Sequence, residues 1–203
     1  MKAYHFVGPT LRDGRPVPPD GEWLEHDGPC VMCESGLHAS RHPFDALRYA
    51  PGSTLCLVEC EDVVEEVSDK LVCRRRKIVR RIDATELLRR FARQQAIKVL
   101  HLWNAPQVVR DYLATGDESL RSAARSAAWL AEASAERTAA WSAARSAARS
   151  AASEAWLSAW SAARSAASAA WLSALSAASD ASVERALRAE FAAMVDEAMG
   201  GAK

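Results

Sequence analysis

The sequence predicts an α+β N-terminal domain, a small mixed or antiparallel sheet with helices, followed by a long Ala-rich α-helical repeat region. Two observations place the boundary near Thr115, which gives segments 1–115 and 116–203. All eight prolines and seven of the nine glycines precede residue 117. Between 117 and 199 the chain has neither residue and consists mainly of Ala, Ser, Arg, Trp and Leu. Glycine and proline interrupt regular structure and alanine favours helix, so this stretch is predicted to be helical.

Composition restricts the class of protein. A chain of 203 residues suits one domain, or one small domain with an appendage. The 26 basic and 26 acidic residues balance, whereas nucleic-acid and membrane-surface proteins usually carry a basic excess. No run approaches the roughly 18 apolar residues of a membrane span, and the opening MKAYHF lacks the pattern of a secretory signal. The five cysteines, an odd number, indicate reduced thiols, so we expect a cytoplasmic protein without membrane contact.

The first half contains short strands and helices. Strands are predicted where apolar and β-branched residues lie between turn residues, at 2–7, within 30–40, and at 54–60, 63–67 and 71–82. Helices are predicted where apolar residues recur at helical spacing, at 43–50, 84–102 and 106–113. Within 30–40 we expect the strand to come first and a turn at Gly36 to follow. The side of 84–102 expected to pack consists of Leu87, Leu88, Phe91, Ile97 and Leu100.

Charged residues are grouped in two blocks. The acidic block contains Glu59, Glu61, Asp62, Glu65, Glu66 and Asp69. The basic block follows, with Lys70 and then Arg74, Arg75, Arg76, Lys77, Arg80 and Arg81. We interpret the two blocks as neighbouring strands that pair opposite charges across the sheet. The alternative is a phosphate- or nucleic-acid-binding face made by the basic residues of 74–81.

The second half repeats every fifteen residues. Trp141, Trp156 and Trp171 are spaced by fifteen, and Leu157 and Leu172 follow two of them directly. Fifteen residues over four turns is about 3.75 residues per turn, more than the 3.6 of a straight helix, and such a repeat favours a right-handed coiled coil.

Tryptophans along a helix without a partner would form an unusually apolar surface. We therefore expect the tail to bury them by self-association into a homo-oligomer. The predicted interface consists of Trp129, Trp141, Trp156, Trp160, Trp171, Leu157 and Leu172. The alternatives are a tail that folds back as a hairpin or bundle, a lone helix, and a passive product of repeat expansion.

Motifs that carry chemistry are sparse. Cys30, Cys33, His38 and His42 have a spacing near that of a zinc knuckle, but the last ligand stands at the wrong offset. No nucleophile-elbow, P-loop or zincin motif is present in the sequence. We therefore predict no metal and no cofactor.

One motif resembles a known family. The sequence CESGLHAS at 33–40, then P-x-D-A-L at 43–47, LVE at 57–59 and DKLV at 69–72, is similar to a domain family found in phages and bacteria. The family pattern is C-x-x-G-[LF]-H-A followed by P-x-D-[AV]-L, and the resemblance covers about residues 2–85. Members often carry repetitive tails, and the family has no assigned activity. The resemblance therefore implies a phage- or prophage-related protein without naming its function.

The order of elements resembles a second family. A His on the first strand, the GLHAS segment, a helix and then TLCLVE are similar to the order in small ADP-ribosyltransferase domains. This resemblance implies that His5 and Ser40 hold the nicotinamide and ribose of NAD, and that Glu65 or Glu66 orients the acceptor. For His38 we expect a turn-stabilising hydrogen bond. The candidate catalytic residues are His5, His38 and Ser40.

The sequence favours a non-enzymatic interaction or assembly protein, whose helical tail oligomerises the N-terminal domain and whose protein partner is unknown. An NAD-binding, ADP-ribosyltransferase-like domain is the first alternative. A nucleic-acid-binding protein that uses the basic residues of 74–81 is the second.

Overall fold

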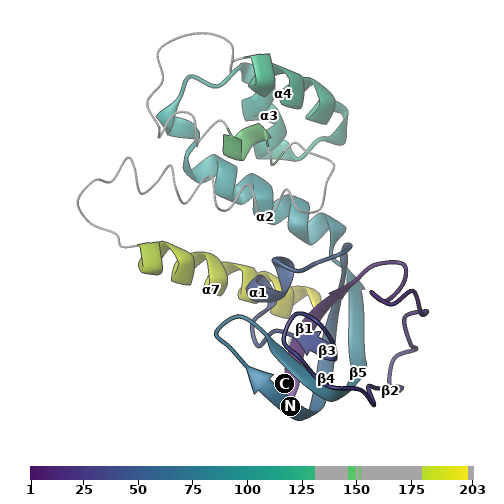
Figure 1. Ribbon diagram of the computed structural model, residues 1–203. Helices are drawn as coiled ribbons and strands as arrows, with labels where there is room; N and C mark the ends of the chain where they lie inside the picture. The colour runs from purple at the N-terminus through teal and green to yellow at the C-terminus, as the bar shows by residue number, and fades with distance from the viewer. Residues whose placement is uncertain (131–145, 150, 152–179, 201–203) are drawn as a thin grey trace. The chain divides into compact units, whose positions relative to one another are not determined.

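The computed structural model describes residues 1–130, 146–149, 151 and 180–200 (Figure 1). The contacts divide the chain into two compact units. The first, which we call the sheet unit, consists of Met1–Thr85 and Arg188–Lys203; the second, the helical unit, consists of Glu86–Leu187. Among the described residues, no helix has the length and apolar character to span a membrane.

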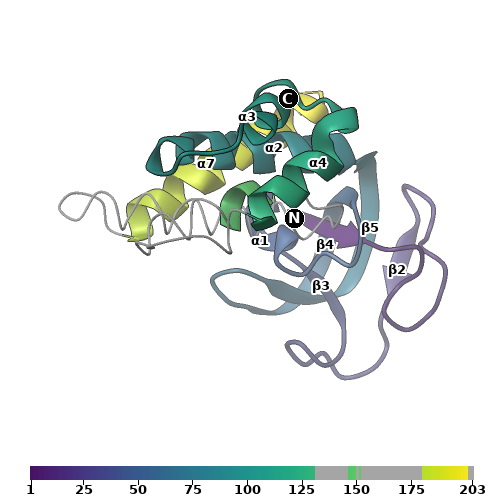
Figure 2. The ribbon, with the colours of Figure 1, turned by 90° about the horizontal axis from the view of Figure 1, so that it is seen from above.

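The sheet unit is built on five antiparallel strands. These are β1 (Lys2–Val7), β2 (Trp23–Glu25), β3 (Leu37–Ala39), β4 (Thr54–Glu66) and β5 (Leu71–Asp83). The long hairpin β4–β5 is central: β1 pairs with the other edge of β4, while β2 and β3 pair with different parts of β5 (Figure 2). The predicted α+β class of the N-terminal segment is confirmed.

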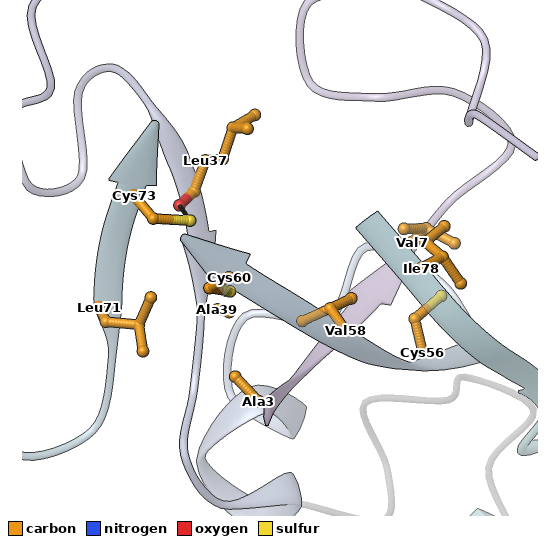
Figure 3. Packing of buried hydrophobic residues seen from close by; sticks show 10 residues of the cluster. All are labelled: Ala3, Val7, Leu37, Ala39, Cys56, Val58, Cys60, Leu71, Cys73 and Ile78. Carbon is orange, nitrogen blue, oxygen red and sulfur yellow. Dashed lines mark hydrogen bonds between the residues drawn. The ribbon is translucent and has the colours of Figure 1, made fainter. Parts of the chain in front are cut away.

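The sheet curls back on itself, because β1 also meets β3. Tyr4 N–H donates to the Ser40 carbonyl at 2.7 Å, and Ser40 N–H donates to the Tyr4 carbonyl at 2.9 Å. The strands β1, β4, β5 and β3 therefore form a closed ring. Alternate residues of these strands gather in one buried cluster, which we call the inner face (Figure 3): Ala3, Val7, Leu37, Ala39, Cys56, Val58, Cys60, Leu71, Cys73 and Ile78.

Opposite charges pair across the β4–β5 hairpin, as predicted. Lys77 Nζ lies 2.7 Å from Glu59 Oε2, and Arg75 Nη1 lies 2.5 Å from Glu61 Oε2. The predicted break between two strands at 61–62 is wrong, because β4 is continuous to Glu66. At this position the strand is irregular but unbroken: Asp62 has a positive φ of 51°, and the register shifts between Val63 and Glu65.

Around Gly36 the predicted order of elements is reversed. Val31 and Ser35 form a tight turn first, and the strand β3 follows it. Gly36 has φ of 102° and lies directly before the first residue of β3, so the turn at Gly36 precedes this strand and does not follow it. The helix predicted at 43–50 is confirmed as α1 (Pro43–Leu47), whose N-terminus is capped by the His42 ring accepting from Phe44 N–H at 3.2 Å.

The last helix, α7 (Asp180–Ala198), contributes its part from Arg188 onward to the sheet unit. There it lies beside α1 (Figure 1). The rings of Phe44 and Phe191 meet edge to face with centroids 5.9 Å apart, and both side chains are fully buried. Arg188 donates from both terminal nitrogens to the Asp45 carboxylate, at 2.5 and 2.6 Å.

The helical unit contains α2 (Thr85–Lys98) from Glu86 onward, the short 3-10 helix η1 (Leu100–Leu102), α3 (Gln107–Thr115) and α4 (Glu118–Leu130). The apolar side predicted for the helix at 84–102 is wrong in part. Leu87, Leu88 and Phe91 are buried, but Ile97 is 43% exposed. The buried stripe continues through Gln95 and Ala96 instead, because these follow Phe91 at helical spacing.

The start of the tail helix is as predicted. Gly116 adopts φ of 71° at the end of α3, and Asp117 Oδ1 accepts from Ser119 N–H at 2.9 Å. The segments α4 and α7 are helical, and Trp129 lies in α4. The other predicted interface residues lie outside the described residues, so the coiled coil and the homo-oligomer remain predictions: Trp141, Trp156, Trp160, Trp171, Leu157 and Leu172.

Candidate functional site

A cavity of about 940 Å³ opens in the sheet unit. This volume lies within the range of small-molecule sites, about 300–1,000 Å³. The loop after β1, the turn before β3, and the strands β1, β3 and β5 all contribute to its walls. His5, His38 and Ser40, which are the candidate catalytic residues from the sequence, all line it.

His5 reaches the cavity from β1. It pairs in register with Cys56 of β4, and Cys56 belongs to the inner face, so the imidazole points to the same side. Burial lowers the pKa of His5 well below its usual value of 6.5, and the nearby Arg76 and His38 lower it further. His5 is therefore a neutral imidazole at pH 7, able to donate one hydrogen bond and accept another.

His38 lies in β3, and Ser40 directly follows this strand, next to β1. His38 Nε2 accepts from the Cys33 backbone N–H at 2.9 Å, which is the expected turn-stabilising bond. Burial lowers the pKa of His38, opposed by a backbone hydrogen bond at Gly36. Ser40 is buried, and its backbone pairing with Tyr4 holds it beside β1.

Arg76 is the one basic residue of 74–81 that lines the cavity. It pairs in register with Cys60 of the inner face, and only 6% of it is exposed. Its Nη1 donates to the His38 carbonyl. Among the described residues, no carboxylate lies within ion-pair distance of this guanidinium. Burial lowers the pKa of Arg76, although arginine keeps its charge at neutral pH.

The other five basic residues are each engaged by the protein itself. Arg75 and Lys77 also flank the Trp23 ring, with their charged groups 4.6 and 4.5 Å from its centroid. Their polar partners include the Gly28 carbonyl for Arg74, Glu25 and Glu61 for Arg75, Glu59 for Lys77, the Met199 carbonyl for Arg80, and Asp20 for Arg81.

The mouth of the cavity carries further cationic groups. Lys70 Nζ lies 2.8 Å from Cys33 Sγ and 4.7 Å from the centroid of the Tyr49 ring. The contact with Cys33 raises the pKa of Lys70. Arg12 Nη1 donates to the Cys33 carbonyl at 2.9 Å, which ties the loop after β1 to the turn before β3. In the described part of the chain, no cluster of three or more His, Cys, Asp or Glu is arranged to hold a metal ion.

The acidic residues implied by the second resemblance lie elsewhere. Glu65 and Glu66 are at the far end of β4, and Glu66 forms a two-point ion pair with Arg41 at 2.8 Å. Neither residue is among those that line the cavity, whose carboxylates are the exposed Asp13 and Glu34. The structure therefore brings His5 and Ser40 together without the acidic group that would orient an acceptor.

Sequence reasoning missed two features of this unit. Arg76 was grouped with its neighbours as part of a basic face, although its register partner Cys60 places it on the inner face. Asp45 belongs to the P-x-D-A-L motif, but its partner Arg188 follows 143 residues later. A signal for Arg76 does exist in the sequence, because it and Ile78 alternate with the charged residues of the outer face.

The histidines make the sheet unit sensitive to acid. His5, His38 and His42 all have lowered pKa values, chiefly because they are buried. As the pH falls through 6.5, these histidines therefore become protonated in the unfolded chain while they stay neutral in the folded chain. Stability is therefore complete above pH 6.5 and falls below it, by up to about 1.4 kcal/mol per pH unit for each neutral histidine. We expect urea unfolding to show this loss between pH 7 and 5.5, and His5→Gln to reduce its slope. A free energy of unfolding that stays constant or increases as the pH falls from 7 to 5.5 would contradict the prediction that these histidines are neutral in the folded chain.

Comparison with known proteins gives a match over the first part of the chain. Residues 1–90 match the family model described as Domain of unknown function (DUF7666). The match includes all five strands and every residue that lines the cavity, but not Arg188 or Phe191. Searches of curated proteins and of solved structures found no match.

Proposed function

We propose that the sheet unit binds a small organic ligand in its cavity, and that NAD or a related nucleotide is the first candidate. The observation that carries the proposal is the gathering of His5, His38 and Ser40 in one cavity of about 940 Å³. Such a volume accommodates a ligand of nucleotide size.

The lining suits a heteroaromatic, polar ligand. A neutral imidazole at His5 offers one donor and one acceptor, and Ser40 adds a hydroxyl on the neighbouring strand. The rings of Tyr4 and Tyr49 supply flat apolar surface to the same cavity. His5 and Ser40 are also the positions that the resemblance to ADP-ribosyltransferase domains connects with nicotinamide and ribose. We propose binding rather than transfer, because Glu65 and Glu66 lie away from these residues.

Calorimetric titration of the full chain with NAD, ADP-ribose and nicotinamide tests this proposal. We expect measurable binding of at least one of them, and a loss of ten-fold or more in affinity for His5→Ala. The matched control is His101→Ala, which removes an exposed histidine of the helical unit and should leave binding unchanged. Absence of binding at millimolar concentration, or equal affinity of His5→Ala and wild type, would refute the proposal.

Assembly through the tail is a second proposal, supported by the fifteen-residue spacing of Trp141, Trp156 and Trp171. It assigns the chain a phage- or prophage-related role in which the tail joins copies of the sheet unit. Light scattering of the full chain should give the mass of an oligomer, and the triple change of these tryptophans to Ala should reduce it to a monomer. A monomeric wild-type chain would end this proposal without affecting ligand binding.

A further inference from the structure

The most unusual group in the sheet unit is the guanidinium of Arg76. Its register partner Cys60 places it on the inner face, whose residues, drawn in Figure 3, are aliphatic side chains and thiols. An arginine that is 6% exposed has lost most of its hydration, and such charges in proteins are normally paired with a carboxylate. In the described residues Arg76 has no such partner, and its Nη1 donates a hydrogen bond to the His38 carbonyl.

The thiols around Arg76 are poor substitutes for a counter-ion. Burial raises the pKa of Cys56 to about 11, and the pKa of Cys73 is also raised, so neither is a thiolate at neutral pH. Cys73 Sγ donates instead to the Leu37 carbonyl at 3.2 Å (Figure 3). The pKa of Cys60 is lowered by its contact with Cys73 and by Arg76. In the described residues the polar surroundings of Arg76 are therefore thiols and the His38 carbonyl, and no carboxylate pairs with it.

We propose that Arg76 is the anchor of an oxyanion subsite in the cavity, which binds a phosphate or carboxylate group of the ligand. Arg76 lines the cavity together with His5 and Ser40. A guanidinium presents parallel N–H donors that match the oxygens of phosphate and carboxylate, and low polarity around it strengthens the interaction. The cations at the mouth, Lys70 and Arg12, attract the same class of ligand. This subsite shares the cavity of the proposed function but does not require the ligand to be a nucleotide.

The charge of Arg76 also predicts how its removal affects stability. Replacing a buried, uncompensated charge with an apolar side chain of similar length is often neutral or stabilising. A residue kept for ligand binding is commonly a cost to the empty protein. We therefore expect Arg76→Met to unfold at the same temperature as wild type or higher, while it loses binding of the anion.

The test is calorimetry of the full chain with inorganic phosphate, pyrophosphate and succinate, together with thermal unfolding. Phosphate and succinate separate the two oxyanion classes, and pyrophosphate represents the linkage in a dinucleotide. We expect wild type to bind at least one of the three, and Arg76→Met to lose ten-fold or more in affinity. The control is Arg74→Gln on the same strand, an exposed residue that bonds to the Gly28 carbonyl and does not line the cavity. It should keep wild-type affinity.

Each result decides between binding and structural roles. Wild type that binds none of the three anions, or Arg76→Met that binds them as wild type does, overturns the subsite. If Arg76→Met does not fold, Arg76→Lys decides: it keeps the charge without the paired donors, so weaker binding supports the subsite and unchanged binding overturns it. Anion binding without nucleotide binding would refute the proposed NAD-type ligand but keep the subsite. If Arg76→Met binds a nucleotide as tightly as wild type does, the oxyanion subsite is refuted and the proposed NAD-type ligand is kept.

Discussion

Replacing Arg188 by Leu is expected to destabilise the sheet unit by about 3 kcal/mol, because it leaves a buried carboxylate without its partner. Asp45 is 1% exposed, and both of its oxygens accept hydrogen bonds from Arg188. Burial already raises the pKa of Asp45 in the intact pair, and Arg188 opposes that effect. Urea unfolding at pH 7, followed by a signal from the sheet unit, measures the loss.

Asp45→Asn and the double variant provide the control. An asparagine at position 45 carries no charge, so Asp45→Asn combined with Arg188→Leu should be more stable than Arg188→Leu alone. In Arg188→Leu the pKa of Asp45 rises further, so the folded chain gains a proton more easily than the unfolded chain, and the deficit should shrink as the pH falls. A deficit that is small at pH 7, or one that Asp45→Asn does not relieve, would mean that the ion pair contributes little.

The fold was predictable where local pattern determines structure. Strands β1 and β5, the first half of β4 and helix α1 follow from apolar runs bounded by turn residues. The charge pairs of Glu59 and Glu61 follow from antiparallel register. The closed ring did not follow, because it depends on the backbone pairing of Tyr4 with Ser40, which no pattern of side chains encodes. The packing of α7 against α1 was also missed, since it joins residues more than 140 positions apart.

The candidate site was predictable only in part. The resemblance to ADP-ribosyltransferase domains selected His5 and Ser40, and both line one cavity. Composition could not separate Arg76 from its neighbours, because burial depends on which side of β5 a residue faces, and only the alternation with Ile78 carries that information. The tail residues selected for their spacing lie outside the described residues, so that interface rests on the sequence alone.

Changing Gly36 to Ala is the second substitution for which we expect a large effect, about 3 kcal/mol of lost stability. Gly36 has φ of 102°, which strains any L residue by about 1–3 kcal/mol. A Cβ atom there would also lie 2.5 Å from Val72 Cγ2 and 3.1 Å from Cys30 Sγ, and Val72 is fully buried. Overpacking of this kind adds about 1–3 kcal/mol. Thermal or urea unfolding of the full chain measures the sum.

Gly14→Ala separates the two contributions to this loss. Gly14 also has a positive φ, 82°, but nothing lies within 4 Å of a Cβ added to it, so only the backbone strain applies. The difference between the two variants reports the clash with Val72 and Cys30. Relief of that clash requires the turn before β3 to move, and this turn positions the Cys33 amide that bonds to His38 at 2.9 Å. Gly36→Ala should therefore also weaken ligand binding in the cavity, whereas equal losses of stability in both variants would show that the turn has room for a side chain.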